Sequence, residues 1–311
     1  MLLKIVLIIF TQLLLAAAGF PICVFFVVFC RQDSHIEESL ETSDVISSEG
    51  GVLSVRYGGD IIHGREVCIT AADGTNLKAD YLERGGDKTV IFVHGYRANP
   101  VKNFSAQCIS FLDRGYDVLF VYQRAHGKSG GKFCCMGCRE SDDVLRWALW
   151  AEENTCGNIV IYGTSMGAAA LAGASENLNG KRVKALVCDC GFTCFYDEMD
   201  SDLKNKRFSR FMVMPVITVF SKLFLKIDIK KSAEISLAEN RIPTAFIIGK
   251  NDKTVPPEIA VKNYTACAAE KVLIDDENSE HARAFEKGGK KIEEELFKFI
   301  DKFAEVASDK K

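Results

Sequence analysis

The sequence predicts an α/β fold with a mostly parallel sheet and helices on both of its faces. Short runs rich in valine, isoleucine and leucine alternate along the chain with segments of helical periodicity. Continuous apolar runs of this kind are typical of parallel strands that are buried on both faces. The chain has 311 residues, of which 48% are apolar, and this is enough for one large core. We therefore expect one main domain rather than two.

The expected strands begin with a hairpin. Residues 67–70 and 77–82 flank Asp73-Gly74, a dipeptide that is typical of tight hairpin turns. This hairpin supplies an antiparallel edge to the sheet. Further strands are predicted over residues 88–93, 117–122, 158–162, 183–188, 244–248 and 271–274. Helices are predicted over residues 105–114, 142–153, 166–178 and 292–303.

The alternation of strands and helices is interrupted between Gly191 and Arg241. Residues 208–217, inside this stretch, are mostly apolar. We expect the region of about 192–240 to form a short helical lid over the strand ends. An ordinary core helix is the alternative interpretation.

The first 30 residues are strongly apolar. From residue 5 to residue 30, only Thr11 and Gln12 interrupt the apolar run. At about 1.5 Å per residue, a helix of this length crosses a bilayer core of about 30 Å. A cleaved signal peptide is the alternative, but the run continues beyond the expected cleavage region at residues 16–18. We expect a transmembrane anchor over residues 1–30, a polar linker over residues 31–59 and the main domain over residues 60–305.

The charges near this segment specify its orientation only weakly. Lys4 precedes the apolar run and Arg31 follows it, so the positive charges nearly balance. Their order slightly favours a main domain on the extracytoplasmic side of the membrane. The twelve cysteines favour a reducing compartment instead.

Charge and cysteine spacing bear on partners and metals. The net charge is 39 − 42 = −3 without a long basic stripe, so we do not expect nucleic acid as a partner. Cys135-x-x-Cys138, together with Cys188-x-Cys190, could bind a metal or form a redox pair. The second pair lacks the two-residue spacing of common zinc sites. We therefore favour unliganded thiols and expect no metal.

A candidate nucleophile is Ser165, in the segment Gly163-Thr164-Ser165-Met166-Gly167. The pattern is short, but here it follows a predicted strand and precedes a predicted helix. A sharp turn at that junction exposes the serine oxygen, and the flanking glycines let the backbone crowd together. A serine that only caps the helix is the alternative.

A serine hydroxyl needs a base, and the position of the histidines favours His281. It is the one histidine that follows the last predicted strand, as the chain order serine, acid, histidine requires. The orienting acid is expected to be Asp252, which follows the strand at residues 244–248. Asp189 is the second candidate because it ends the preceding strand. Backbone N–H groups of Tyr96 and Met166 are expected to form the oxyanion hole.

Five segments together resemble the α/β-hydrolase superfamily. They are Val93-His94-Gly95-Tyr96, Gln123-Arg124-Ala125-His126-Gly127-Lys128-Ser129, Gly163-Thr164-Ser165-Met166-Gly167, Gly249-Lys250-Asn251-Asp252 and Glu280-His281. The chain is most similar to the bacterial monoacylglycerol-lipase-like and serine-aminopeptidase-like branch, over most of residues 60–305. The resemblance implies hydrolysis of an ester, thioester or amide without a metal or organic cofactor. Tyr122 departs from the pattern, because relatives often carry aspartate there.

We therefore expect a serine hydrolase that cleaves carboxylic esters through an acyl-enzyme, with a small acyl ester as substrate. A small-residue aminopeptidase or a thioesterase of the same fold is the alternative enzyme. A catalytically silent binding protein on a hydrolase scaffold is the alternative outside enzymes. It predicts a broken triad, whereas Ser165, His281 and Asp252 are all present.

Overall fold

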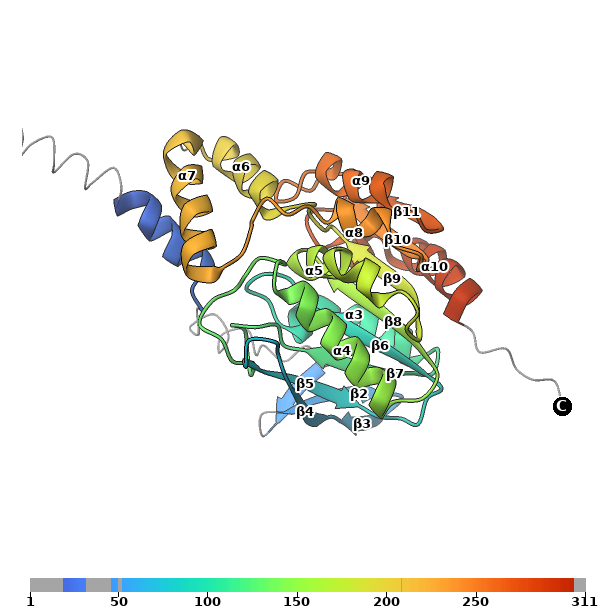
Figure 1. Ribbon diagram of the computed structural model, residues 1–311. Coiled ribbons are helices and arrows are strands. Elements are labelled where there is room, and N and C mark those ends of the chain that lie inside the picture. Colours follow the sequence, from blue (N-terminus) through green and yellow to red (C-terminus); the bar gives the residue numbers. More distant parts are fainter. Residues whose placement is uncertain (1–18, 32–45, 50–51, 208, 305–311) are drawn as a thin grey trace, which may run out of the picture.

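A central sheet of eight strands organises the molecule (Figure 1). The computed structural model describes residues 19–31, 46–49, 52–207 and 209–304. The strand order is β11-β10-β9-β8-β6-β7-β5-β4. The strands are β4 (Arg65–Thr70), β5 (Asn76–Leu82), β6 (Lys88–Val93), β7 (Tyr116–Val121), β8 (Asn158–Thr164), β9 (Val183–Asp189), β10 (Thr244–Gly249) and β11 (Lys271–Asp276).

The direction of the strands confirms the predicted fold class. The strands from β7 through β6, β8, β9 and β10 to β11 pair in parallel. The hairpin of β4 and β5 lies antiparallel at one edge, where β5 pairs with β7. Parallel strands align their carboxyl ends, so the loops that follow β6, β8, β9 and β10 meet at one edge of the sheet.

Helices cover both faces of the sheet, and they do so because successive strand side chains point to opposite faces. In β6, Val90 and Phe92 face one helix layer, whereas Ile91 and Val93 face the other. The first layer consists of α3 (Pro100–Leu112) and α10 (Ala284–Ala304). The second consists of α4 (Glu140–Asn154), α5 (Met166–Ala174), η1 (Ser175–Leu178), α8 (Glu234–Ala238) and α9 (Pro257–Ala266).

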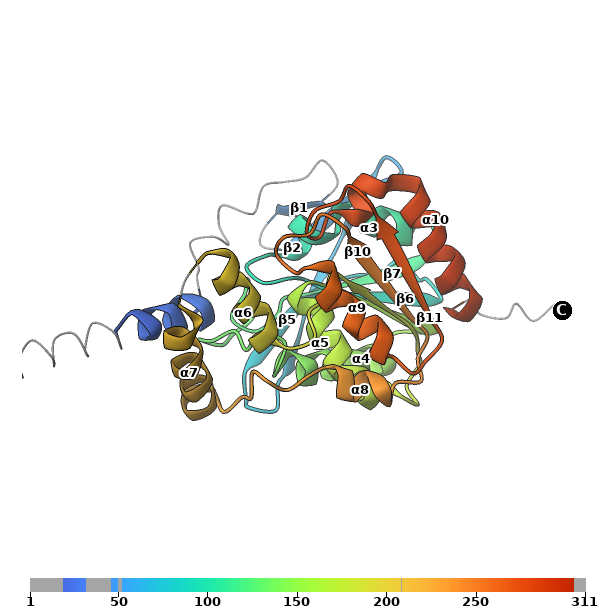
Figure 2. The same ribbon diagram turned by 90° about the horizontal axis from the view of Figure 1, so that it is seen from above.

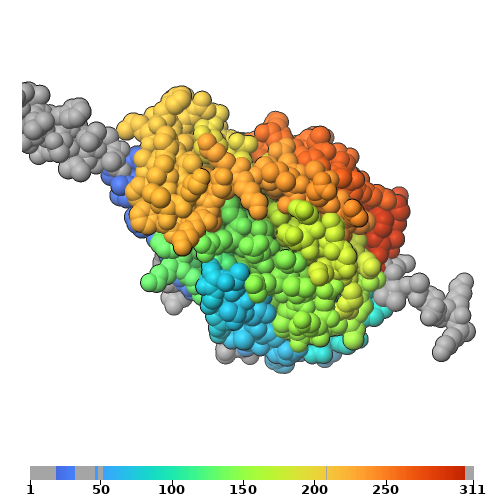
Figure 3. Space-filling view, in the orientation of Figure 1, coloured from blue at the N-terminus to red at the C-terminus, as the bar shows by residue number. Residues whose placement is uncertain are grey.

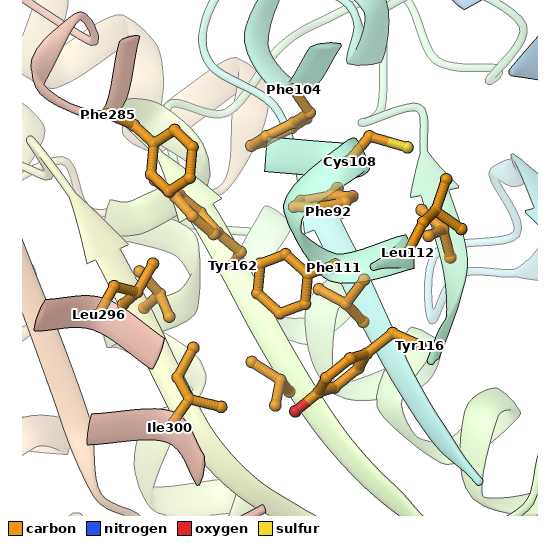
Figure 4. Packing of buried hydrophobic residues seen from close by; sticks show 14 of the residues in the cluster. Phe92, Phe104, Cys108, Phe111, Leu112, Tyr116, Tyr162, Phe285, Leu296 and Ile300 are labelled. Carbon is orange, nitrogen blue, oxygen red and sulfur yellow. The ribbon is translucent and has the colours of Figure 1, made fainter. Parts of the chain in front are cut away.

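Aromatic side chains fill the core between the sheet and α3. Phe92 stacks on Phe104 with ring centroids 4.5 Å apart and meets Phe111 edge to face at 5.5 Å (Figure 4). Leu296 and Ile300 of α10 are fully buried in the same cluster. Such aromatic pairs contribute about 0.5–1.5 kcal/mol beyond the area that they bury.

A second, smaller sheet precedes the central one. It is antiparallel and contains β1 (Ile46–Glu49), β2 (Val52–Tyr57) and β3 (Asp60–His63). The linker predicted over residues 31–59 is therefore partly a sheet, while residues 32–45 lie outside the described residues. Leu53 and Val55 of β2 are fully buried. The turn signal Gly58-Gly59, in which both glycines have positive φ, could have identified the hairpin.

The predicted membrane anchor is wrong for the part of it that the structure describes. Residues 1–18 lie outside the described residues, and residues 19–29 form a helix. Among the helices that the structure describes, none is both long and apolar enough to cross a bilayer. This finding contradicts a single-pass anchor and the membrane location inferred from it. The helix over residues 19–29 instead buries Phe25 and Phe29 against the rest of the protein.

The insertion predicted over residues 192–240 contains both lid and core helices. We call this range the lid region. α6 (Phe195–Asn205), α7 (Arg210–Phe220) and the π-helical turn η2 (Ser221–Leu225) lie beyond the sheet edge, whereas α8 packs on the sheet with the core. The alternative of an ordinary core helix therefore holds for α8.

The helix over residues 19–29 lies beside α6 and α7 in both ribbon views (Figures 1 and 2). Its atoms, blue in the space-filling view, lie against those of the lid region (Figure 3). Phe29 contacts Phe195 with ring centroids 5.5 Å apart, and Phe25 contacts Phe220 at 5.6 Å. These aromatic residues belong to a third apolar cluster, which also contains Met166 and which we call the lid cluster.

Candidate active site

Ser165 lies at the sharp turn between β8 and α5. Its backbone has φ 54° and ψ −117°, a conformation that a residue with a side chain rarely adopts. The flanking glycines make this turn feasible. A Cβ atom on Gly163 would lie 2.5 Å from the carbonyl oxygen of Gly167, and one on Gly167 would lie 2.0 Å from that of Val93. Larger residues would therefore force the turn open.

His281 reaches Ser165 from the segment that follows β11. Its Nε2 lies 2.8 Å from Ser165 Oγ, and its Nδ1 lies 2.6 Å from Asp252 Oδ2. An ionised carboxylate only accepts hydrogen bonds, so Nδ1 donates to Asp252. In the neutral ring, Nε2 is then free to accept the Ser165 hydroxyl proton. The three predicted side chains are thus joined by two short hydrogen bonds.

Asp252 is held in place by the turn that it begins. Its Oδ1 accepts hydrogen bonds from the backbone N–H groups of Thr254 and Val255 at 2.8 and 2.9 Å. Its loop approaches the His281 segment closely, because a Cβ atom on Gly249 would lie 2.4 Å from Ser279 O. The remaining carboxylate oxygen of Asp252 faces His281.

Asp189, the second candidate acid, has a different partner. Its Oδ2 accepts a 3.0 Å hydrogen bond from the hydroxyl of Tyr162, and its backbone oxygen accepts one from Ser165 N–H. Burial raises the pKa of Asp189 to about 6, although the Tyr162 hydroxyl lowers it. The hydrogen bond from the His281 imidazole goes to Asp252, so the geometry favours Asp252 as the orienting acid.

The two predicted oxyanion-hole residues flank Ser165. Met166 is the first residue of α5, where helix geometry leaves the backbone N–H without an intrahelical acceptor. Tyr96 follows Gly95, and a Cβ atom on Gly95 would lie only 3.3 Å from Ser165 Cβ. None of the described residues accepts a hydrogen bond from Tyr96 N–H. Both N–H groups are therefore available beside the serine.

The two other histidines near this edge have structural contacts. His94 Nε2 accepts a hydrogen bond from Gln123 N–H at 3.1 Å, and His126 Nε2 accepts one from Arg97 N–H at 3.0 Å. Burial lowers the pKa of His94 to about 3 and that of His126 to about 4. Both rings are therefore neutral at pH 7 and tie the surrounding loops together.

Tyr122, at the position where the resemblance implies an aspartate, helps to keep its loop packed. Its hydroxyl donates a 2.9 Å hydrogen bond to buried Asp80. Lys128 Nζ binds the same carboxylate at 2.6 Å. The loop that contains Gln123–Ser129 is thus tied to β5 despite the departure from the pattern.

Among the described residues, the two cysteine pairs do not come together as a candidate ligand group. Within the described residues, the candidate ligand group is Cys190 with Asp252 and His281, whose ligand atoms lie within 4.8 Å of one another. Cys138 instead contacts the backbone oxygen of Asp228 at 3.7 Å. Burial raises the pKa of Cys138 to about 12, so its thiol stays protonated. All twelve cysteines are free thiols.

Sequence reasoning did not identify Glu198, a lid-region carboxylate near the triad. It lies on α6, and burial raises its pKa to about 7. Asp202 and Asp252 raise this pKa further, whereas His281 and Lys206 lower it. The interaction with His281 shows that Glu198 reaches the site electrostatically. No local motif marks this residue, because its position depends on how the lid region folds.

Comparisons with known proteins agree with this architecture. The family model described as X-Pro dipeptidyl-peptidase (S15 family) matches residues 55–206. The uncharacterized protein YqkD of Bacillus subtilis (strain 168) is 30% identical over 242 residues, which cover 75% of this chain and 78% of that protein.

Solved structures share the fold at lower identity. The esterase Pf2001 of Pyrococcus furiosus is 24% identical with a TM-score of 0.63, over 78% of this chain and 92% of that one. The esterase EaEST of Exiguobacterium antarcticum is 21% identical with a TM-score of 0.56, over 76% of this chain and 99% of that one. At such identities the likeness shows the fold alone. With the relationship to YqkD and this shared fold, the chain belongs to the α/β-hydrolase superfamily.

Proposed function

We propose that this protein is a serine hydrolase that cleaves carboxylic esters. The observation that supports this most strongly is the continuous pair of hydrogen bonds from Asp252 through His281 to Ser165, at 2.6 and 2.8 Å. A nucleophile, a base and an orienting acid in this geometry can perform acyl transfer.

In the proposed mechanism, Ser165 attacks the carbonyl carbon of the substrate while His281 takes the hydroxyl proton. The developing oxyanion accepts hydrogen bonds from the N–H groups of Tyr96 and Met166. His281 then gives its proton to the leaving alcohol, and an acyl-enzyme remains. A water molecule, activated by His281 in the same way, releases the acid. Asp252 keeps the imidazole in the required tautomer and stabilises the imidazolium.

The surroundings of Ser165 favour an ester with an apolar acyl group. Met166 and Phe195 belong to the lid cluster, and half-buried Tyr96 packs against it. Apolar side chains beside the serine would contact hydrocarbon without leaving polar groups unpaired. Structural neighbours that are named as esterases support the same reaction class.

An aminopeptidase is the second candidate, and one observation favours it. Glu198 on α6 is a carboxylate that interacts electrostatically with His281, and it could bind the ammonium group of a peptide N-terminus. The match to the X-Pro dipeptidyl-peptidase family is consistent with this activity. A thioesterase would use the same side chains without Glu198.

Comparison of two substrate types separates the candidates. p-Nitrophenyl esters of acetic, butyric and octanoic acid are measured beside the p-nitroanilides of alanine and glycyl-proline. We expect at least one ester to exceed both anilides in kcat/KM. Faster cleavage of an anilide would replace the esterase proposal by a peptidase. Failure to turn over any of the substrates or to react with a fluorophosphonate would indicate a binding protein.

A further inference from the structure

The N-terminal segment, residues 19–31, directly contacts the loop after β6 that contains Tyr96. The Tyr96 hydroxyl donates a 2.8 Å hydrogen bond to the backbone oxygen of Val28, and the Arg97 guanidinium donates one to that of Val27. Both acceptors lie at the C-terminal end of the helix over residues 19–29. A cation such as Arg97 is also favoured there by the helix dipole. Two side chains of the loop that contains Tyr96 are thus tied to the end of this helix.

A second set of contacts fixes the adjoining loop, residues 123–129, which in turn holds Arg97. Arg31 donates from one guanidinium nitrogen to Ser129 O and from another, at 2.7 Å, to Gly127 O. These carbonyls follow His126, whose Nε2 accepts the hydrogen bond from Arg97 N–H at 3.0 Å. The residue after Tyr96 is therefore held through both its side chain and its backbone.

The segment is itself anchored by backbone pairing and by burial. Arg31 N–H donates to Lys132 O at 2.9 Å, and Cys134 N–H donates to Phe29 O at 2.8 Å. Phe25 and Phe29 are fully buried in the lid cluster. Because its position is set independently of the loop, the segment can act as a fixed support for Tyr96.

We infer that residues 19–31 are a positioning element of the catalytic centre, which holds Tyr96 N–H where the oxyanion develops. The inference rests on the proposed function, because it needs an oxyanion at Ser165. Tyr96 contributes through its side chain as a positioning residue, and Arg31 supports the adjoining loop. A donor held in advance stabilises the transition state more than the bound substrate. Removing the contacts that hold Tyr96 N–H in place should therefore lower kcat and leave KM nearly unchanged.

The test uses the full chain with two substitutions. Tyr96→Phe removes only the hydroxyl that donates to Val28, and Arg31→Lys keeps the charge but loses the planar fork that binds two carbonyls. We expect Tyr96→Phe to lower kcat for p-nitrophenyl butyrate by about tenfold and Arg31→Lys by several-fold, with KM within twofold, because full loss of one oxyanion donor costs about 100- to 1,000-fold. Tyr57→Phe is the matched control, since its hydroxyl also makes one 2.8 Å bond, to Asp113.

A transition-state analogue separates positioning from a purely structural contact. The inhibition constant of a trifluoromethyl ketone, which forms a tetrahedral adduct with the serine, should rise by the same factor as kcat/KM falls. The affinity for butyrate, a product without an oxyanion adduct, should not change. Wild-type values of kcat and of the inhibition constant in both variants would overturn the inference, as would a lower melting temperature with unchanged kcat per folded molecule. A wild-type protein that neither hydrolyses the ester nor binds the trifluoromethyl ketone would instead contradict the proposed function.

Discussion

Replacing Ser165 with alanine is expected to lower kcat for p-nitrophenyl butyrate by at least about 10⁴-fold. The variant loses the only atom in the proposed mechanism that forms the acyl-enzyme. Substrate binding and the oxyanion donors remain, so slow hydrolysis above the rate in water is still possible. The measurement is initial-rate kinetics on purified protein, with circular dichroism to show that the fold is retained.

The control for this variant lies at the other end of α5, where Ser175 begins η1. Ser175 is fully buried and donates a 2.8 Å hydrogen bond to Ala172 O at the end of α5. The Ser175→Ala variant should cost about 1 kcal/mol of stability and keep its kcat. If Ser165→Ala retained wild-type turnover while remaining folded, another group would be the nucleophile.

Replacing Asp143 with alanine is expected to lower the free energy of unfolding by about 3 kcal/mol. Asp143 forms two 2.7 Å hydrogen bonds with the guanidinium of Arg124, and both side chains are almost fully buried. Among the ion pairs of the described residues, the buried guanidinium then keeps the 2.8 Å one to Asp73, a carboxylate that is 30% exposed. Chemical denaturation measures the change.

The adjacent residue provides a matched control for this prediction. Asp142 lies in the same first turn of α4, but its side chain is exposed. The Asp142→Ala variant loses only its favourable interaction with the helix N-terminus, at a cost of about 0.3–1 kcal/mol. An equal decrease in the free energy of unfolding in the two variants would show that the buried pair of Asp143 and Arg124 contributes no more to stability than an exposed carboxylate.

The predictable part of the fold was the part with strong local patterns. Apolar runs such as residues 88–93 and 158–162 favour buried strands, because they are rich in β-branched residues and shorter than most helices. The predicted strand before Ser165 and the predicted helix after it identified Ser165 as a candidate nucleophile. The chain order serine, acid, histidine then identified His281 as the candidate base. Their catalytic roles stay proposals, but the structure does bring these side chains together.

The choice between Asp252 and Asp189 needed coordinates. Each residue lies at or just beyond the carboxyl end of a strand, and neighbouring parallel strands place both near the same edge. Sequence position alone cannot decide which carboxylate the imidazole reaches. In the structure, the Tyr162 hydroxyl donates a hydrogen bond to Asp189, whereas His281 Nδ1 pairs with Asp252.

The N-terminal segment was misjudged because apolar composition does not reveal what a helix packs against. A helix of apolar residues can pack equally well against lipid or against the aromatic side chains of α6 and α7. Phe25 and Phe29 are buried by protein, a fact that depends on the fold of the lid region more than 160 residues later. The location of Glu198 near His281 depends on the same region, and so it was also not predictable.

The most direct test of the central claim is the site at which a fluorophosphonate reacts with the folded wild-type protein. Such probes phosphonylate a serine that is activated by a base, so labelling reports nucleophile, base and oxyanion donors together. Intact-mass and peptide mass spectrometry should show one adduct, located on Ser165, and none after His281→Ala substitution. An adduct on another residue, or folded protein that takes up no label, would contradict the account.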